Sequence, residues 1–215
     1  QQFAAHMGAD ALAVIPTAPE QPRNRDCDYP YRHDSYFYYL TGFTEPNACL
    51  VMRTDAHGQL QSTLFCQPKD MEREIWHSIT ELDAQLPKLL ENTRSVFYPF
   101  ATHQGLDARI AGWIDKVRAR VRYGVTAPGT LHDACSALDE MRLIKDAHEI
   151  AILRQAAQIS AQAHIRAMQT SAAMLRAGQD AREYHLEAEL LHEFCRNGAQ
   201  IPAYSNIVAA GANAC

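Results

Sequence analysis

The feature that most constrains this chain is a second half that carries too few elements to bury its own apolar surface. Asp146 and Glu149 have the spacing of a helix-capping box, and apolar residues follow at helical intervals. The sequence therefore predicts a long amphipathic helix from about residue 146. The apolar positions of this helix are Ile150, Leu153, Ala157, Ala163 and Ala167.

A second helix is predicted from about Asp180, which with Glu183 repeats the capping pattern, to a stop at Gly198. The segment YSNIVAAGANAC then predicts one strand and a glycine-containing turn. A lone strand needs sheet neighbours, and two helices need a surface to cover. We therefore expect residues 146–215 to be an incomplete unit, with Cys215 a break in a longer chain.

The first 140 or so residues have a different character and predict one α/β domain. Short apolar or β-branched runs predict strands, helical periodicity predicts two helices, and the turn-like DAHGQ predicts a hairpin between the second and third strands. The expected strands are 11–16, 48–52, 62–66 and 95–98, and the expected helices are 82–90 and 106–117. We place the domain boundaries at 1–142 and 146–215.

Composition predicts a folded protein that binds neither nucleic acid nor membrane. The 215 residues are 47% hydrophobic and carry a formal net charge of -5, and the basic residues form no long run. No apolar stretch approaches the roughly 18 residues of a membrane span. The six cysteines show no CxxC pair or zinc-type grouping, which is typical of reduced thiols in a cytoplasmic protein.

The stretch DYPYRHDSYFYYLTGFTEP contains about half of all the tyrosine and phenylalanine in the chain. Asp34 or Ser35 can cap a short helix through Leu40, and Gly42 can end it. Some of the rings are then core residues. Because each buried phenol needs a hydrogen-bond partner, the tyrosines also predict a semi-polar wall.

Sequence motifs for common catalytic sites are absent. The chain has no G-x-S-x-G, H-E-x-x-H, G-x-G-x-x-G or P-loop pattern. In HLEAELLHE, His185, Glu189 and His192 share one helical stripe, as in di-metal carboxylate bundles. Such a site needs a second half, and the preceding helix offers only His164, so a solvated polar face is the favoured interpretation.

Of three further residues, Trp76 has both a plain and a functional interpretation, and Asp26 and Arg122 have a plain one. Trp76, in REIWHSIT, is either a half-buried surface indole or one wall of a ligand site. Asp26 and Arg122 are ordinary exposed charges or a weak surface pair on residue type alone.

Several motifs in order resemble the aminopeptidase P family, the Xaa-Pro aminopeptidases. They are YPYRHDSYFYYLTGFTEP, EIWH, EMRLIKDAHEIAILRQA and EYHLEAELLHEFCRNGAQIPAYSNIVAAGANAC. The resemblance is weakest between about residues 77 and 120. It implies an α/β fold with a creatinase-like N-terminal domain and mixed sheet, followed by an incomplete α+β pita-bread metallopeptidase domain.

The resemblance also implies roles for four residues. N-terminal domains of the family mediate oligomerisation, and one subunit helps to close the proline-binding site of the next. By motif position Trp76 would wall that site, and Asp26 and Arg122 would belong to its polar network. Tyr204, in IPAYSNIV, would lie close to the metal site.

The implied parent protein is a dinuclear metallopeptidase that releases the N-terminal residue of peptides with proline second. The family uses two metal ions, typically manganese, whose ligands would all follow Cys215, so this chain alone is expected to be inactive. The expected partners are the peptide substrate and further copies of the chain, as a dimer or tetramer. Three alternatives stay open: a prolidase or creatinase-type hydrolase, a peptidase-like binding module without catalysis, and a freestanding N-terminal dimerisation module.

Overall fold

The computed structural model describes residues 1–66 and 78–214. These residues divide into two compact units, Gln1–Ile144 and Lys145–Cys215. No described helix is both long enough and apolar enough to cross a membrane.

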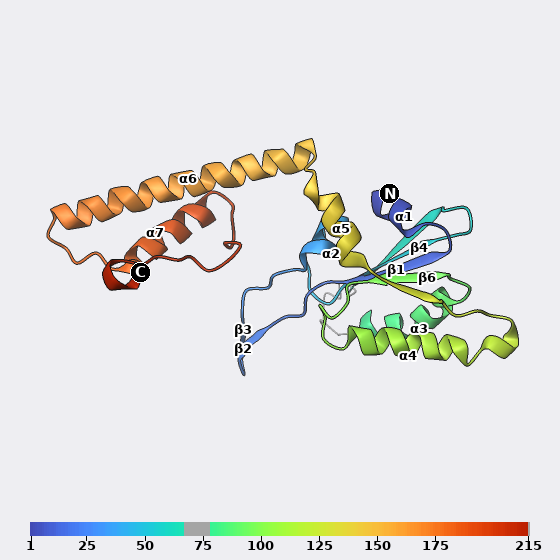
Figure 1. Cartoon of the computed structure of the whole chain (residues 1–215). Coiled ribbons are helices and arrows are strands. Elements are labelled where there is room, and N and C mark those ends of the chain that lie inside the picture. The colour runs from blue at the N-terminus through green and yellow to red at the C-terminus, as the bar shows by residue number, and fades with distance from the viewer. Residues whose placement is uncertain (67–77, 215) are drawn as a thin grey trace, which may run out of the picture. The chain divides into compact units, whose positions relative to one another are not determined.

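The first unit contains a five-stranded sheet with helices on both faces (Figure 1). The strands of the sheet are β1 (Ala11–Pro16), β4 (Cys49–Thr54), β5 (Leu60–Phe65), β6 (Ser95–Tyr98) and β7 (Thr130–Asp133). The helices are α1 (Gln2–Met7), α2 (Ser35–Thr41), α3 (Ser78–Leu90), α4 (Leu106–Arg118) and α5 (Ala134–Leu143), with a 3-10 turn η1 (Val121–Tyr123). A separate exposed ribbon pairs β2 (Pro22–Asn24) with β3 (Cys27–Asp28).

The sheet is mixed, with the strand order β5-β4-β1-β6-β7. β4 pairs antiparallel with both β1 and β5, which confirms the predicted hairpin. β6 pairs parallel with both β1 and β7. The carboxyl ends of β1, β6 and β7 therefore lie at one edge of the sheet.

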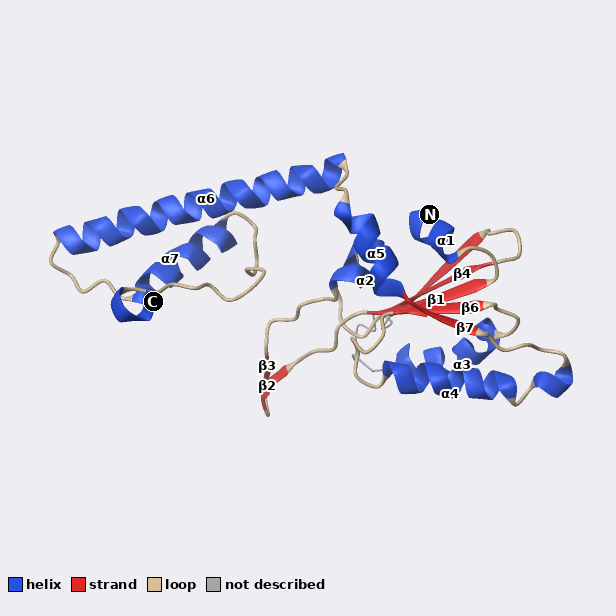
Figure 2. Cartoon of the chain, in the orientation of Figure 1, coloured by secondary structure: helices blue, strands red, loops and turns tan. Residues whose placement is uncertain are grey.

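The alternation of side chains along β1 divides the core between two helical layers. Leu12 and Val14 join the apolar cluster that contains α3 and α4. Ala13 and Ile15 join the cluster that contains α1, α2 and α5. Figure 2 shows these two groups of helices on opposite faces of the sheet. Because both faces are covered, β1 is a continuous apolar run rather than an alternating one.

The short helix predicted in the aromatic stretch is confirmed as α2. The Asp34 carboxylate accepts hydrogen bonds from the backbone N–H groups of Tyr36 and Phe37, both at 2.9 Å. Gly42 ends the helix in the left-handed conformation, with φ 66°. Phe37 is fully buried in the core, as expected for some of the rings.

Besides the short β2–β3 ribbon and η1, the strand β7 and the helix α5 of the first unit were not predicted. β7 has the sequence TLHD, in which only Leu131 is strongly apolar, and none of its residues is fully buried. It forms because its backbone pairs with β6, as in an edge strand. α5 follows directly, with Asp133 accepting a hydrogen bond from the Cys135 N–H at 3.0 Å.

The second unit consists of α6 (Ala147–Arg176), α7 (Glu183–Arg196) and the 3-10 turn η2 (Gly211–Ala214). The predicted capping box of α6 is confirmed. Asp146 accepts from the Glu149 N–H at 2.8 Å, and Glu149 accepts from the Asp146 N–H at 2.9 Å.

The predicted start of α7 at Asp180 is wrong. The helix begins at Glu183, because the Asp180 carboxylate pairs with Arg182 instead of capping a helical N–H. The backbone N–H of Arg182 donates to His185 Nδ1 at 3.1 Å. The predicted stop is confirmed, since Gly198 follows the helix with φ 89°.

The strand predicted in YSNIVAAGANAC is also wrong. Residues 201–210 have no regular secondary structure, and residues 211–214 form η2. No other strand lies among the described residues of this unit, so the segment has no ladder to join there.

The helices of the second unit leave much apolar surface exposed, as the packing argument predicts. Across the described residues of the unit, Ala163 is the only buried side chain of α6, and α7 has none. Ile152, Leu153 and Met168 of α6 are each more than half exposed.

Candidate functional site

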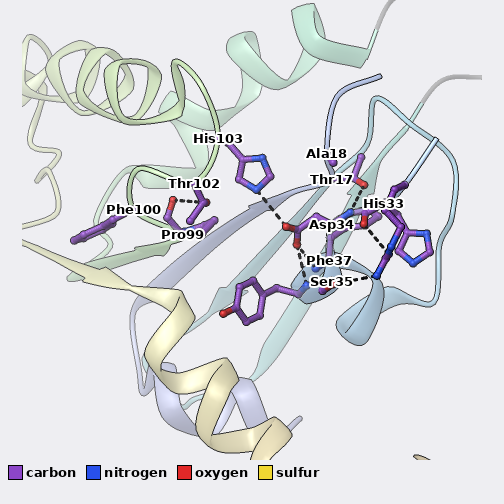
Figure 3. A network of polar contacts seen from close by, with 12 residues as sticks. Thr17, Ala18, His33, Asp34, Ser35, Phe37, Pro99, Phe100, Thr102 and His103 are labelled. Carbon is purple, nitrogen blue, oxygen red and sulfur yellow. Dashed lines mark hydrogen bonds and ion pairs between the residues drawn. The ribbon is translucent and has the colours of Figure 1, made fainter. Parts of the chain in front are cut away.

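Polar side chains gather at the sheet edge where the parallel strands β1 and β6 end. Thr17 directly follows β1, and His103 lies in the loop between β6 and α4. Asp34, at the start of α2, lies between them (Figure 3). Segments that leave adjacent parallel strands at their carboxyl ends commonly form binding sites in α/β proteins.

One carboxylate oxygen of Asp34 caps α2, and the other faces His103. Its Oδ1 caps α2, and its Oδ2 lies 3.7 Å from His103 Nε2. The Asp34 backbone N–H donates to Thr17 Oγ1 at 3.4 Å. The carboxylate is therefore held in place by bonds that do not involve the histidine.

The tyrosines nearby form the semi-polar wall that the sequence predicts. The Tyr31 hydroxyl lies 2.7 Å from Thr17 Oγ1 and donates to the Ala18 carbonyl at 3.1 Å. Burial raises the pKa of Tyr31. Tyr36 donates to Asp139 at 2.7 Å, so this phenol is also paired.

His103 is largely buried and stays neutral at neutral pH. Burial lowers its pKa below the ordinary 6.5, and this effect exceeds the opposing attraction of Asp34. The distance of 3.7 Å is too long for a hydrogen bond. Within the described residues, His103 Nε2 is a buried nitrogen without a hydrogen-bond partner.

A cavity of about 320 Å³ lies beside this cluster. Its lining includes Thr17, His103 and Arg109, together with apolar side chains such as Val14 and Leu106. Its volume is at the lower end of the range for small-molecule sites, roughly 300–1,000 Å³.

The structure describes three of the four residues singled out from the sequence and places them on separate elements. Asp26 is exposed in the β2–β3 turn, where its N–H donates to Asn24 Oδ1 at 3.1 Å. Arg122 is exposed on η1. Figure 1 shows the β2–β3 ribbon and the segment after α4 at opposite ends of the first unit, so one chain does not bring them together. Tyr204 is 75% exposed in the second unit, and Trp76 lies outside the described residues.

The stripe of His185, Glu189 and His192 on α7 is not arranged around a metal. Glu189 pairs with Arg166 of α6, whose guanidinium also lies 3.6 Å from Glu193. This part of the polar face joins the two helices. In the described parts of both units, no group of three or more His, Cys, Asp or Glu could hold a metal ion.

The Asp34–His103 pair was not predicted from the sequence. Asp34 was identified only as a helix cap, and His103 was not singled out. A polar loop directly after a strand was the available signal. It becomes informative only when that strand is known to run parallel to β1, and pairing of strands so far apart in sequence is not visible in local patterns.

Two family models match the chain. The aminopeptidase P N-terminal domain matches residues 1–85, and metallopeptidase family M24 matches residues 151–215. The Xaa-Pro aminopeptidase of Escherichia coli is 36% identical over the whole of this chain and 52% of its own length. That of Haemophilus influenzae is 34% identical over 98% of this chain and 49% of its own length. The chain thus spans about half the length of these relatives.

Solved structures agree with the sequence comparisons. The Pseudomonas aeruginosa aminopeptidase PepP superposes with a TM-score of 0.87 and 38% identity, over 99% of this chain and 51% of its own. Escherichia coli aminopeptidase P with the inhibitor Pro-Leu superposes with a TM-score of 0.83 and 35% identity, over 94% of this chain and 49% of its own. These matches confirm the expected fold class, a creatinase-like N-terminal domain with a mixed sheet, followed by a pita-bread domain. The chain belongs to the aminopeptidase P family.

Proposed function

We propose that this chain is part of an Xaa-Pro aminopeptidase, an enzyme that releases the N-terminal residue of peptides whose second residue is proline. The observation that carries the proposal is the 36% identity to the Escherichia coli Xaa-Pro aminopeptidase across the whole chain. The match of residues 151–215 to metallopeptidase family M24 supports a hydrolase. A relative solved with the inhibitor Pro-Leu supports recognition of proline.

The metal site is proposed to lie outside these 215 residues. The metallopeptidase match implies divalent metal ions, and manganese is our specific assignment. The described residues do not fit such a site, because they offer no suitable cluster of ligands. Because the chain spans about half the length of its relatives, we place the ligands in the rest of the parent protein and expect residues 1–215 alone to be inactive.

We assign residues 1–142 to oligomerisation and to one wall of the substrate site, and residues 146–215 to the metallopeptidase domain. Asp26 and Arg122 are both exposed and lie on separate elements, which suits contact with a neighbouring subunit better than a network within one chain. Trp76 would wall the same site, and Tyr204, with its exposed ring, would approach the metals. The protein would then act as a homodimer or homotetramer.

A cytoplasmic location is the last part of the proposal. The five described cysteines are all free, as expected in a reducing compartment.

Hydrolysis of matched peptides by the full-length protein that contains this chain tests the proposal. With manganese supplied, we expect cleavage of Ala-Pro-Ala and little cleavage of Ala-Ala-Ala. A prolidase would instead prefer the dipeptide Ala-Pro. A binding module without catalysis would cleave none of these peptides, and that result would reject the enzyme assignment.

The roles of the four residues need their own variants. Trp76→Ala should raise KM for Ala-Pro-Ala in an assembled oligomer. Asp115→Ala, an exposed change on α4, should leave KM unchanged. An unchanged KM in the Trp76 variant would remove this residue from the site.

A further inference from the structure

The segment that follows α7 is attached to this helix at both of its ends. Just beyond the helix, the Ala199 N–H donates to the Phe194 carbonyl, in the last turn of α7, at 3.0 Å. At the far end of the segment, the Ala210 N–H donates to Oε1 of Glu183, the first residue of α7, at 2.9 Å. Figure 1 shows the segment returning along α7 to η2, beside the start of the helix. Residues 199–210 therefore form a loop that is closed on one helix.

Glu183 holds a whole turn rather than a single N–H. Its Oε1 also accepts from Asn213 Nδ2 at 3.0 Å. The turn is closed by the Asn213 backbone N–H, which donates to the Ala210 carbonyl at 3.2 Å. Gly211 supplies the left-handed conformation that the turn needs, with φ 58°. One carboxylate oxygen thus binds both ends of a turn that lies 27 to 30 residues further along the chain.

The carboxylate of Glu183 is ionised at neutral pH, which strengthens both contacts. The hydrogen bond from Asn213, followed by that from the Ala210 N–H, lowers the pKa of Glu183 below its ordinary 4.5. A charged acceptor makes a stronger hydrogen bond than a neutral one. An acidic residue in the first turn of a helix also interacts favourably with the helix dipole. Contacts with residues so distant in the chain indicate a role beyond the helix itself.

Tyr204 lies on the closed loop, between its two points of attachment. Residues 199–210 have no regular secondary structure, so neither helical nor strand hydrogen bonds fix the backbone there. The Tyr204 side chain is 75% exposed and adds little packing of its own. The position of Tyr204 therefore depends mainly on the attachments at residues 199 and 210.

We propose that Glu183 is a positioning residue of the peptidase site, which holds the 210–213 turn and so fixes the loop that carries Tyr204. This inference rests on the proposed function, in which Tyr204 approaches the metals. Glu183 acts through the loop and does not itself contact the substrate. Without its carboxylate the loop would be attached at residue 199 alone. A site residue displaced by about 1 Å can cost a roughly 100-fold loss in rate.

The kinetics of the full-length, manganese-supplied protein on Ala-Pro-Ala test this role. Glu183→Ala should lower kcat per folded enzyme about tenfold and change KM less than about twofold, because the groups that bind the substrate are retained. Glu183→Gln keeps an oxygen that accepts both hydrogen bonds and should recover most of the activity, which also covers the case in which the Ala variant does not fold. Asp115→Ala, an exposed change on α4, is the control and should leave both constants unchanged.

A double-mutant cycle separates the contact from a general effect on the helix. Asn213→Ala removes one of the two donors and should also lower kcat. The Glu183→Ala/Asn213→Ala protein should lose less activity than the product of the two single losses, because both changes remove the same contact. Hydrogen exchange of the Ala210 amide, followed by mass spectrometry, should be faster in Glu183→Ala than in the wild type and intermediate in Glu183→Gln.

The outcomes for the proposed function and for this inference are distinguishable. A wild-type protein that leaves Ala-Pro-Ala intact rejects the proposed function and, with it, the role of Glu183. A wild-type protein that cleaves the peptide, with Glu183→Ala at the same kcat, overturns this inference alone. Losses in the Glu183 and Asn213 variants that simply multiply would also overturn it, since the two residues would then act independently.

Discussion

Trp113 donates its indole N–H to the Asp83 carboxylate across 3.0 Å and so joins α4 to α3. The same oxygen accepts from Arg109 at 2.9 Å, and the Arg109 guanidinium lies over the Trp113 ring. Trp113 is only 2% exposed, so its N–H depends on this acceptor. One carboxylate thus fixes two side chains on the helix that leads away from the candidate site.

Asp83→Ala is expected to lower the free energy of unfolding by about 1–3 kcal/mol, because the buried indole N–H loses its acceptor. The shift in urea midpoint measures this loss. Asp115→Ala, exposed on α4, is the control and should cost no more than about 0.5 kcal/mol. Equal losses in the two variants would contradict the role given to Asp83.

The pKa of His103 predicts a stability that falls in mild acid. Burial lowers this pKa below 6.5 in the folded state, so the unfolded state binds the proton more readily. Stability should therefore decrease as the pH falls below about 6.5 and level off below the folded-state pKa. His103→Gln should remove this part of the pH dependence in urea titrations between about pH 7.5 and 5.

Burial lowers the pKa of His33 also. His33→Gln is therefore the comparison for His103→Gln. The pH dependence of stability should decrease more in the His103 variant than in the His33 variant, because His103 is the more buried ring. A His103→Gln profile that follows the wild type would show that the histidine is not desolvated as described.

The elements that could be predicted from sequence are those with a local signal. Residues 95–98 (SVFY) are mostly apolar or aromatic and form β6, which is buried along its whole length. The Asp34 cap and Gly42 stop define α2 from both ends. In such segments the residue types themselves indicate whether the segment is buried and where it ends.

Apart from the start of α7, what could not be predicted depends on distant partners. β7 is exposed and acquires its structure by pairing with β6. The start of α7 is shifted because Asp180 meets Arg182, and either capping or ion pairing was compatible with the local sequence. The approach of His103 to Asp34 requires the whole sheet, since the two residues follow different strands.

The α6 capping box provides a test of local helix stability. Asp146→Ala removes the acceptor for the Glu149 N–H and should cost about 0.5–2 kcal/mol, whereas Asp146→Ser should retain most of the cap. Hydrogen exchange at the Glu149 amide should be faster in the Ala variant than in the Ser variant. Identical exchange in both would show that the cap does not hold the first turn.

The cysteines should differ widely in their reaction with iodoacetamide. Burial raises the pKa of Cys49 to about 12 and that of Cys135 to about 11, whereas Cys27 and Cys195 are exposed. At about pH 8 the Cys49 thiol is therefore almost entirely protonated, and access to it is blocked as well. Peptide mass spectrometry after a short pulse should find Cys27 and Cys195 labelled and Cys49 intact.

A labelling control in urea should remove these differences, because unfolding exposes every thiol. Labelling of Cys49 at the rate of Cys27 in the native chain would contradict its place in the core.

The mass of the products released from Ala-Pro-Ala by the full-length, manganese-supplied protein tests the central claim most directly. The account predicts free alanine and the dipeptide Pro-Ala, with activity lost on chelation and restored by metal. No cleavage, or cleavage that leaves Ala-Pro as a product, would contradict the assignment as an Xaa-Pro aminopeptidase.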